Sequence, residues 1–174
     1  MRLNPKKRLA GLVLLCISTP ALATIDIKFV ESAPKDWFAL ANSTECPLTH
    51  VRMDVDLSSS AGKLIFDTTA SGAGVEVFQP FEVRDGNVTL HAAESVNDGD
   101  TQLSVIIENL APGETASFTI DVDDTLTNSE LGMIRVSKSE ITGSVIKLTL
   151  HDSDKLEGSL DNDGKLQLKA PSCQ

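Results

Sequence analysis

Apolar and polar side chains alternate with a period of two along most of this chain. Ile25, Ile27 and Phe29 alternate with polar neighbours. The same alternation recurs over residues 51–57, 103–107, 118–122 and 146–150. This spacing, at positions rich in β-branched side chains, is typical of β-strands that bury one face. Residues 125–131 are the best helical candidate, and they are long enough for one turn at most.

Turn sequences separate these predicted strands. They are Asp85-Gly86-Asn87, Asp98-Gly99, Pro112-Gly113 and Asp163-Gly164. Glycine supplies the positive φ that tight turns need, so we expect one hairpin between 88–96 and 101–108 and another between 156–160 and 165–168. About nine to eleven short strands at this spacing predict an all-β fold, a single antiparallel β-sandwich of the Ig-like or jelly-roll type. A closed barrel is the alternative.

The first 23 residues have the pattern of a signal peptide. A basic segment with four Lys and Arg residues precedes an apolar run over residues 9–17, and Ala21-Leu22-Ala23 matches a signal-peptidase cleavage site. Leu15 stands before Cys16 where a lipoprotein needs a small residue, so we do not expect a lipid anchor. The apolar run is shorter than the roughly 20 residues that cross a bilayer, and no later segment approaches that length. We therefore predict a single domain over residues 24–174, located in the periplasm or secreted.

The negative charge of the chain limits the classes of partner that it is expected to bind. The formal net charge is −10, and loss of the four basic residues of the predicted signal peptide makes it −14. A field of that sign repels nucleic acid and anionic lipid headgroups, and it favours cations and basic partners. The acidity also keeps an exported protein soluble, which is the simpler interpretation.

Two cysteines remain in the predicted exported domain, Cys46 and Cys173. An even number of cysteines in an oxidising compartment predicts a disulfide. The closed loop would include nearly the whole domain, and the chain-entropy model gives it about 4 to 5 kcal/mol of stabilisation. Two buried free thiols are the alternative, and no C-x-x-C spacing suggests redox catalysis.

The densest acidic stretch is Asp121-Val122-Asp123-Asp124. Strand alternation places Asp121 and Asp123 on one face with Cα atoms about 7 Å apart, and Asp124 enters the following loop. Carboxylates at this spacing converge on a hard cation when other oxygen atoms complete the coordination. We therefore consider Asp121, Asp123 and Asp124 a candidate calcium site. The alternative is a solvated acidic edge that discourages strand pairing.

The other motifs are weaker evidence for a functional site. Residues 161–164 superficially match an EF-hand loop, but Ser159 and Ala170 then occupy positions that require acidic ligands, so a turn is the better interpretation. The Gly-rich stretch 70–74 precedes a strand pattern rather than a helix and is expected to be an ordinary connection. Trp37 is expected in the core, although an exposed ring would suit glycan stacking.

Catalytic signatures are absent from the sequence. His50, His91 and His151 are widely separated and follow no metal-binding spacing. There is no G-x-S-x-G or H-E-x-x-H motif for nucleophilic or zinc-dependent hydrolysis. A carboxylate pair of a hydrolase stays open among the 25 acidic residues.

Four stretches carry a resemblance to a known group of proteins. They are residues 31–36, 64–69, 72–82 and 118–126. Together they resemble small exported bacterial proteins labelled aggregation factor core protein, a name taken from the sponge proteoglycan of calcium-dependent cell aggregation. The resemblance implies a role in adhesion, with calcium as the cofactor and an unknown protein or glycan at the cell surface as the partner.

We therefore predict an exported β-sandwich that binds or adheres, through calcium-dependent cell aggregation or surface attachment, and that is not an enzyme. Two alternatives from other classes stay open. One is a periplasmic hydrolase that uses a carboxylate pair, and the other is a structural subunit without a ligand.

Overall fold

The computed structural model describes residues 23–32, 35–75, 77–91, 95–151 and 154–171. The predicted signal peptide, except for its last residue, and Cys173 lie outside the described residues. Antiparallel strands dominate the described part of the chain, and the single helix there, α1 (Lys138–Ile141), is one turn long. The expected all-β class is confirmed. No helix in these ranges is both long enough and apolar enough to cross a bilayer.

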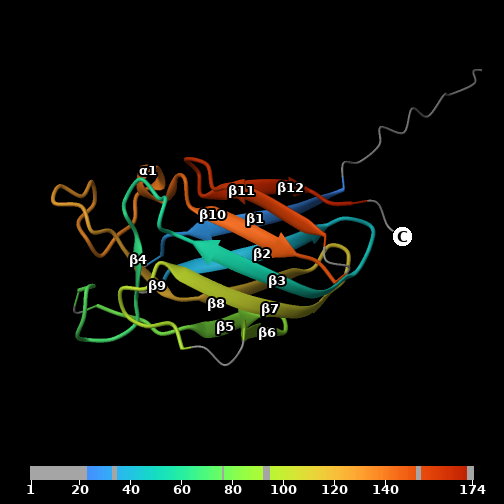
Figure 1. Cartoon of the computed structure of the whole chain (residues 1–174), viewed down its shortest axis with the longest axis horizontal. Helices are drawn as coiled ribbons and strands as arrows, with labels where there is room; N and C mark the ends of the chain where they lie inside the picture. The colour runs from blue at the N-terminus through green and yellow to red at the C-terminus, as the bar shows by residue number, and fades with distance from the viewer. Residues whose placement is uncertain (1–22, 33–34, 76, 92–94, 152–153, 172–174) are drawn as a thin grey trace, which may run out of the picture.

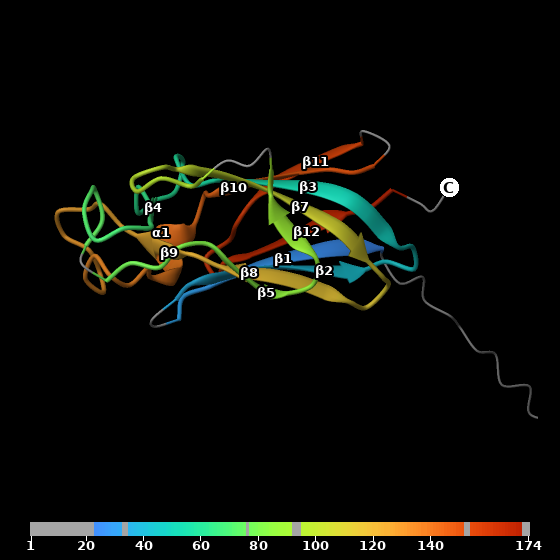
Figure 2. The ribbon, with the colours of Figure 1, turned by 90° about the horizontal axis from the view of Figure 1, so that it is seen from below.

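Two five-stranded sheets form the body of the molecule (Figures 1 and 2). The first sheet has the order β12 (Lys165–Lys169), β1 (Thr24–Val30), β2 (Trp37–Ser43), β8 (Thr115–Thr119) and β5 (Glu82–Asp85). The second has the order β11 (Lys155–Ser159), β10 (Val145–Thr149), β3 (Leu48–Asp56), β7 (Gln102–Leu110) and β6 (Val88–Leu90). The sheets pack face to face as a sandwich, and the described strands form no closed barrel.

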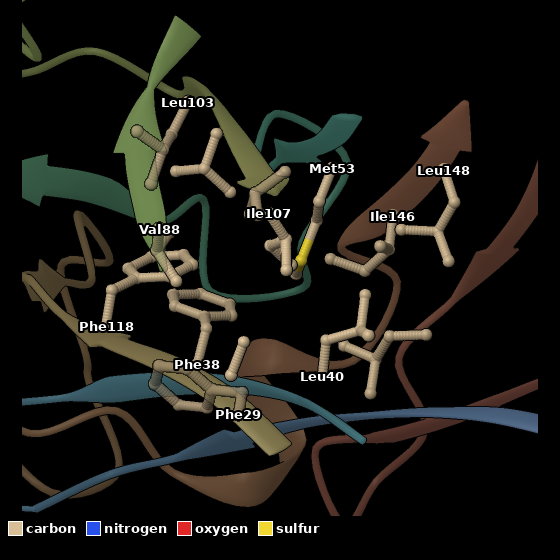
Figure 3. Packing of buried hydrophobic residues seen from close by; sticks show 14 of the residues in the cluster. Phe29, Phe38, Leu40, Met53, Val88, Leu103, Ile107, Phe118, Ile146 and Leu148 are labelled. Carbon is tan, nitrogen blue, oxygen red and sulfur yellow. The ribbon is translucent and has the colours of Figure 1, made fainter. Parts of the chain in front are cut away.

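The core lies between the two sheets, where alternate side chains from both layers meet (Figure 3). Phe38 and Leu40 of β2 are almost fully buried, as are Met53 of β3 and Ile146 of β10. The Phe38 ring stacks on Phe118 of the neighbouring strand with ring centroids 5.4 Å apart. This burial supplies the hydrophobic stabilisation that the period-two pattern of the sequence predicts.

Trp37 lies outside this core, so the expectation that it packs there is wrong. It precedes Phe38 in β2, and successive strand residues point to opposite faces of a sheet. The Trp37 ring is half-buried on the outer face, where the Arg84 guanidinium carbon lies 4.3 Å from the ring centroid and the Lys28 Nζ lies 5.5 Å from it. These cations cover the indole by cation–π contact instead of core packing.

Three of the four predicted turn sequences connect the two sheets instead of forming hairpins within one sheet. The turn at Asp163-Gly164 joins β11 to β12, which belong to different sheets, so the hairpin expected there is wrong. Pro112-Gly113 and the turn at 85–87 also join strands of different sheets. Their glycines have positive φ values of 67° to 81°, as the turn chemistry requires, but this local geometry does not determine the layer that the chain enters next.

The expected pairing across residues 91–101 is confirmed in part. β6 pairs with β7 in antiparallel register, with Val88 opposite Ile107. However, β6 ends at Leu90, several residues before the predicted end of the strand. Instead, the Gly99 amide donates to the Phe66 carbonyl at 2.9 Å, and the Phe66 amide donates to the Asp100 carbonyl at 2.8 Å.

Phe66 belongs to a separate two-stranded ribbon at one end of the sandwich (Figure 1). Its strands are β4 (Ile65–Asp67) and β9 (Asp121–Asp123). β9 follows β8 with only Ile120 between them, so the ribbon continues the first sheet directly. Phe66 and Val122 are fully buried and attach the ribbon to the core.

The strands that precede Cys46 and Cys173 end at the same end of the first sheet. Thr24 at the start of β1 pairs with Ser43, the last residue of β2, and also with Lys169, the last residue of β12. Cys46 therefore follows one neighbour of β1, and the chain toward Cys173 follows the other. The pairing of the two cysteines stays a prediction because Cys173 is outside the described residues.

Candidate metal site

Three aspartates from the β4–β9 ribbon converge on one point. Asp67 lies directly opposite Asp121 in the antiparallel register, and Asp123 is two residues further along β9. Each side chain offers an oxygen atom, and these three atoms lie within 4.8 Å of one another. Asp67 and Asp123 have no exposed surface, and Asp121 is 5% exposed.

The strand pattern explains why these side chains share one face. Val122, between the two aspartates of β9, points to the hydrophobic core, as does its partner Phe66. The neighbouring residues on each strand therefore point the other way. Because Asp67 and Asp121 are cross-strand partners, their side chains are held close on that face. The candidate site is thus fixed by the register of the ribbon.

Few polar groups compensate these carboxylates. The Val75 amide donates to Asp67 Oδ2 and to Asp123 Oδ2, at 3.0 Å in both cases. The remaining buried oxygen atoms Asp67 Oδ1, Asp123 Oδ1 and Asp121 Oδ2 have no hydrogen-bond partner. None of the ion pairs between described residues involves the three aspartates. An unpaired buried carboxylate is strongly unfavourable unless it takes up a proton or a cation.

The Gly-rich stretch 70–74 wraps this cluster, although the sequence suggested an ordinary connection. Its Ala73 amide donates to Asp98 Oδ2 at 2.6 Å, and the Asp98 Oδ1 accepts from the Thr68 amide at 3.2 Å. Gly74 lies so close to the cluster that a Cβ atom there would be 2.2 Å from the Asp67 Cγ. Only glycine allows this approach of the backbone to the carboxylates.

Burial and mutual repulsion shift the acidity of the cluster. Burial, together with the neighbouring carboxylates of Asp98 and Asp123, raises the pKa of Asp67 to about 8. Burial and the charge of Asp123 raise the pKa of Asp121 to about 7. Burial also raises the pKa of Asp123, although the Val75 amide opposes that shift. Without a cation, the cluster therefore holds protons near neutral pH.

Asp124 is placed differently from the other predicted site residues. It is fully buried, and its Oδ1 accepts a hydrogen bond from the Leu126 amide at 2.9 Å. Its Oδ2 has no partner, but it is not one of the three converging oxygen atoms. Its charge acts on Asp123 and raises the pKa of that group. The structure thus brings together Asp121 and Asp123 of the expected set and adds Asp67 as the third member.

The sequence contained little sign of Asp67. It is a single acidic residue 54 positions before Asp121, at the end of a short apolar run. Only the pairing of β4 with β9 brings it to the site. The available signal was the run of small residues directly after it, since a glycine next to a buried group often marks a close approach of the backbone.

The other candidate residues show no comparable arrangement. Asp161 Oδ1 accepts hydrogen bonds from the amides of Asp163 and Lys165, which is the bonding of a turn. His50 Nδ1 lies 3.2 Å from Glu108 on the exposed face of the second sheet. Within the described residues, only Asp67, Asp121 and Asp123 bring three potential metal-ligating side chains together.

The donor set fits a hard cation. Carboxylate oxygens suit calcium, magnesium and manganese, whereas the nitrogen and sulfur ligands preferred by zinc and copper are absent from this cluster. Calcium takes six to eight oxygen ligands in flexible geometry and tolerates an all-protein cage, whereas magnesium usually retains several waters. The burial of the cluster therefore favours calcium.

Comparisons with known proteins do not identify this chain. No family model matches the sequence, and no curated protein matches it. Among solved structures, the fold is similar to part of a family GH18 chitinase from Chromobacterium violaceum, with 11% sequence identity and a TM-score of 0.34. That match covers 86% of this chain and 20% of the chitinase chain. A likeness this distant carries no argument about activity, and the resemblance to aggregation factor core proteins stays a prediction.

The cluster makes a prediction for the metal-free protein. The pKa values of Asp67 and Asp121 are higher in the folded state than the value of about 3.9 in the unfolded chain, so the folded state binds more protons between pH 4 and about 8. In calcium-free buffer, stability should therefore fall as the pH rises through this window. We expect a lower melting temperature at pH 8 than at pH 5, and a smaller difference in Asp121→Asn.

Asp163→Asn is the matched control for this measurement. Asp163 is exposed, and the ion pair with Lys138 lowers its pKa, so it is ionised at both pH 5 and pH 8. This variant should keep the pH dependence of the unmodified protein. A melting temperature that rises with pH, or a difference left unchanged by Asp121→Asn, would contradict the assignment.

Proposed function

We propose that this protein is an exported β-sandwich module that binds calcium at Asp67, Asp121 and Asp123. The observation that carries the proposal is the set of three converging, buried carboxylates with unpaired oxygen atoms. A structural subunit without a ligand would have only bound protons to offset this repulsion. A calcium ion would replace the missing partners and neutralise the charge.

The burial also bears on the hydrolase alternative. A hydrolase that uses a carboxylate pair must bring both groups into contact with its substrate, on opposite sides of the bond that breaks. Asp67 and Asp123 have no exposed surface in this structure, so a polymeric substrate has no access to them. This geometry favours an ion over a substrate as the ligand.

The role we propose for the calcium-bound module is adhesion, as calcium-dependent aggregation or surface attachment. Three features support it: the signal-peptide pattern, the acidic charge of the exported domain, and the resemblance to aggregation factor core proteins. The ribbon that carries the proposed calcium ligands lies at one end of the sandwich, next to the loops that follow β4 and β9.

Calcium binding is tested by calorimetry and thermal unfolding. Calcium at 100 times its dissociation constant should stabilise the folded state by about 2.7 kcal/mol, which raises the melting temperature by roughly 5 to 10 °C for a domain of this size. Asp123→Asn should weaken binding at least roughly tenfold, since loss of even an outer-shell partner has an effect of that order.

Asp161→Asn serves as the control because it changes the acidic turn at residues 161–164 and leaves the ribbon intact. It should bind calcium as the unmodified protein does. A flat titration of the unmodified protein, or equal loss in both variants, would reject the site.

The predicted disulfide is tested by thiol labelling and intact mass. Export to an oxidising compartment should leave Cys46 and Cys173 bonded, so no label should be incorporated into the folded or urea-unfolded protein before reduction. Two labels per chain should be incorporated after reduction. Two labels in unfolded, unreduced protein would disprove the bond.

Adhesion is tested with beads that carry the purified domain. Beads should clump in millimolar calcium and disperse when a chelator is added. Beads with Asp123→Asn should stay dispersed, whereas beads with Asp161→Asn should clump normally. Clumping that ignores both the chelator and the Asp123 substitution would separate adhesion from the calcium site.

A further inference from the structure

The outer face of the first sheet contains a groove that lies across β12, β1, β2 and β8. Figure 2 shows this sheet as one of the two layers of the sandwich, and the groove is on the side turned away from the other layer. Its volume is about 580 Å³, which is within the range of about 300 to 1,000 Å³ for small-molecule sites. None of its lining residues belongs to the calcium cluster.

Two small residues of β2 form the floor of the groove. Ala39 and Ala41 alternate with core residues of the same strand, so their methyl groups point to the outer face. Ala39 lies opposite Lys28 of β1, and Ala41 lies opposite Asp26. Longer side chains therefore stand beside a floor of methyl groups. Trp37, two residues before Ala39 on the same face, adds an aromatic ring to the lining.

Two lysines face each other in this groove. Lys28 of β1 is the register partner of Lys165 of β12, and both line the groove. Cross-strand partners have Cβ atoms about 4.5 to 5.5 Å apart, and like charges in this arrangement are destabilising. Neither lysine forms an ion pair with a described residue. An anion bound between them would remove this repulsion.

The acidic residues that line the groove already have hydrogen-bond donors. Asp26 accepts a hydrogen bond from Gln167 Nε2 at 2.7 Å and one from the Ser43 hydroxyl at 2.5 Å. Asp161 accepts two backbone amides of its own turn through Oδ1. Neighbouring donors therefore compensate these two carboxylates in part, whereas no described acidic group pairs with the two lysines.

We infer that this groove binds an acidic oligosaccharide, with a uronate carboxylate between Lys28 and Lys165. A uronic acid carries its carboxylate directly on the sugar ring. One unit can therefore place its charge at the lysines and its apolar face on the alanine floor beside the Trp37 indole. Thr115 and Gln167 supply polar groups for the sugar hydroxyls. This inference goes beyond the proposed function, because its site shares no residue with the calcium ligands.

The architecture of this face favours a carbohydrate over an acidic peptide. β1, β2 and β8 are each paired on both sides within the first sheet. The groove therefore offers no free edge on these strands, and a peptide backbone cannot join the sheet there. An indole beside a floor of methyl groups instead suits the flat apolar faces of sugar rings.

The net charge of the domain is compatible with a short acidic ligand. At physiological ionic strength the Debye length is about 8 Å, so acidic groups elsewhere on the surface are largely screened from the groove. A short oligosaccharide therefore interacts mainly with the charges that line the groove. Its binding should weaken as the salt concentration rises.

The test uses Trp37, which is the only tryptophan in the chain, so that its fluorescence reports on the groove directly. Trigalacturonate or trimannuronate, added in a buffer with a chelator, should change the emission saturably and give matching calorimetry. The methyl ester of the same trisaccharide has the rings without the charge. It should bind at least roughly tenfold more weakly, because hydrogen bonds to a charged group are lost.

Two double variants test the lysines. Lys28→Gln with Lys165→Gln should bind at least roughly tenfold more weakly, and its melting temperature should not fall, because two facing like charges are removed. Lys147→Gln with Lys155→Gln is the matched control, since it removes the same charge from the second sheet. The control should bind as the unmodified protein does.

Three results would overturn the inference: no binding of either trisaccharide, equal loss in the two double variants, or equal binding of triglutamate. Asp123→Asn separates it from the proposed function, because this variant should lose calcium binding and keep the oligosaccharide. Oligosaccharide binding that requires calcium would also overturn the inference. A flat calcium titration beside saturable oligosaccharide binding would reject the calcium site alone.

Discussion

Repulsion between buried carboxylates is the constraint on which the proposed function of this protein depends. A hydrophobic core of this size can hold a ribbon of two short strands at the end of a sandwich, and Phe66 and Val122 do so here. In the same ribbon, Asp67 lies opposite Asp121, and both side chains are buried from solvent. A fold that pairs these residues must compensate their charge, by protons when no cation is present or by a cation when one is available.

The three aspartates also contact segments outside the ribbon. β9 continues β8 after a single residue, so the position of Asp121 depends on the packing of the first sheet. The stretch that follows β4 approaches the carboxylates through Gly74, and the loop after β9 closes on Asp124. The segments that follow β4 and β9 therefore contact the cluster or its neighbour Asp124 directly, while apolar burial fixes the core between the sheets.

Much of the fold follows from the sequence because period-two alternation specifies which face of each strand is buried. The same alternation correctly places Asp121 and Asp123 side by side. It does not reveal Asp67, since that depends on which strands pair, and the pairing of β4 with β9 joins segments far apart in the chain. Turn residues have the same limit: Gly164 adopts positive φ as expected, but its turn leads to the other sheet. Trp37 shows a third limit, because its apolar ring suggested burial while its strand position determined exposure.

Negative charge is distributed both over the surface of the protein and within the buried cluster. Residues 24–174 are strongly anionic, which raises the local concentration of divalent cations around them and opposes close contact with anionic surfaces. At the ribbon end, the carboxylates of Asp67, Asp121 and Asp123 are buried, whereas Glu130 on the loop after β9 is exposed. In the proposed function, a calcium ion neutralises the charge of this buried cluster.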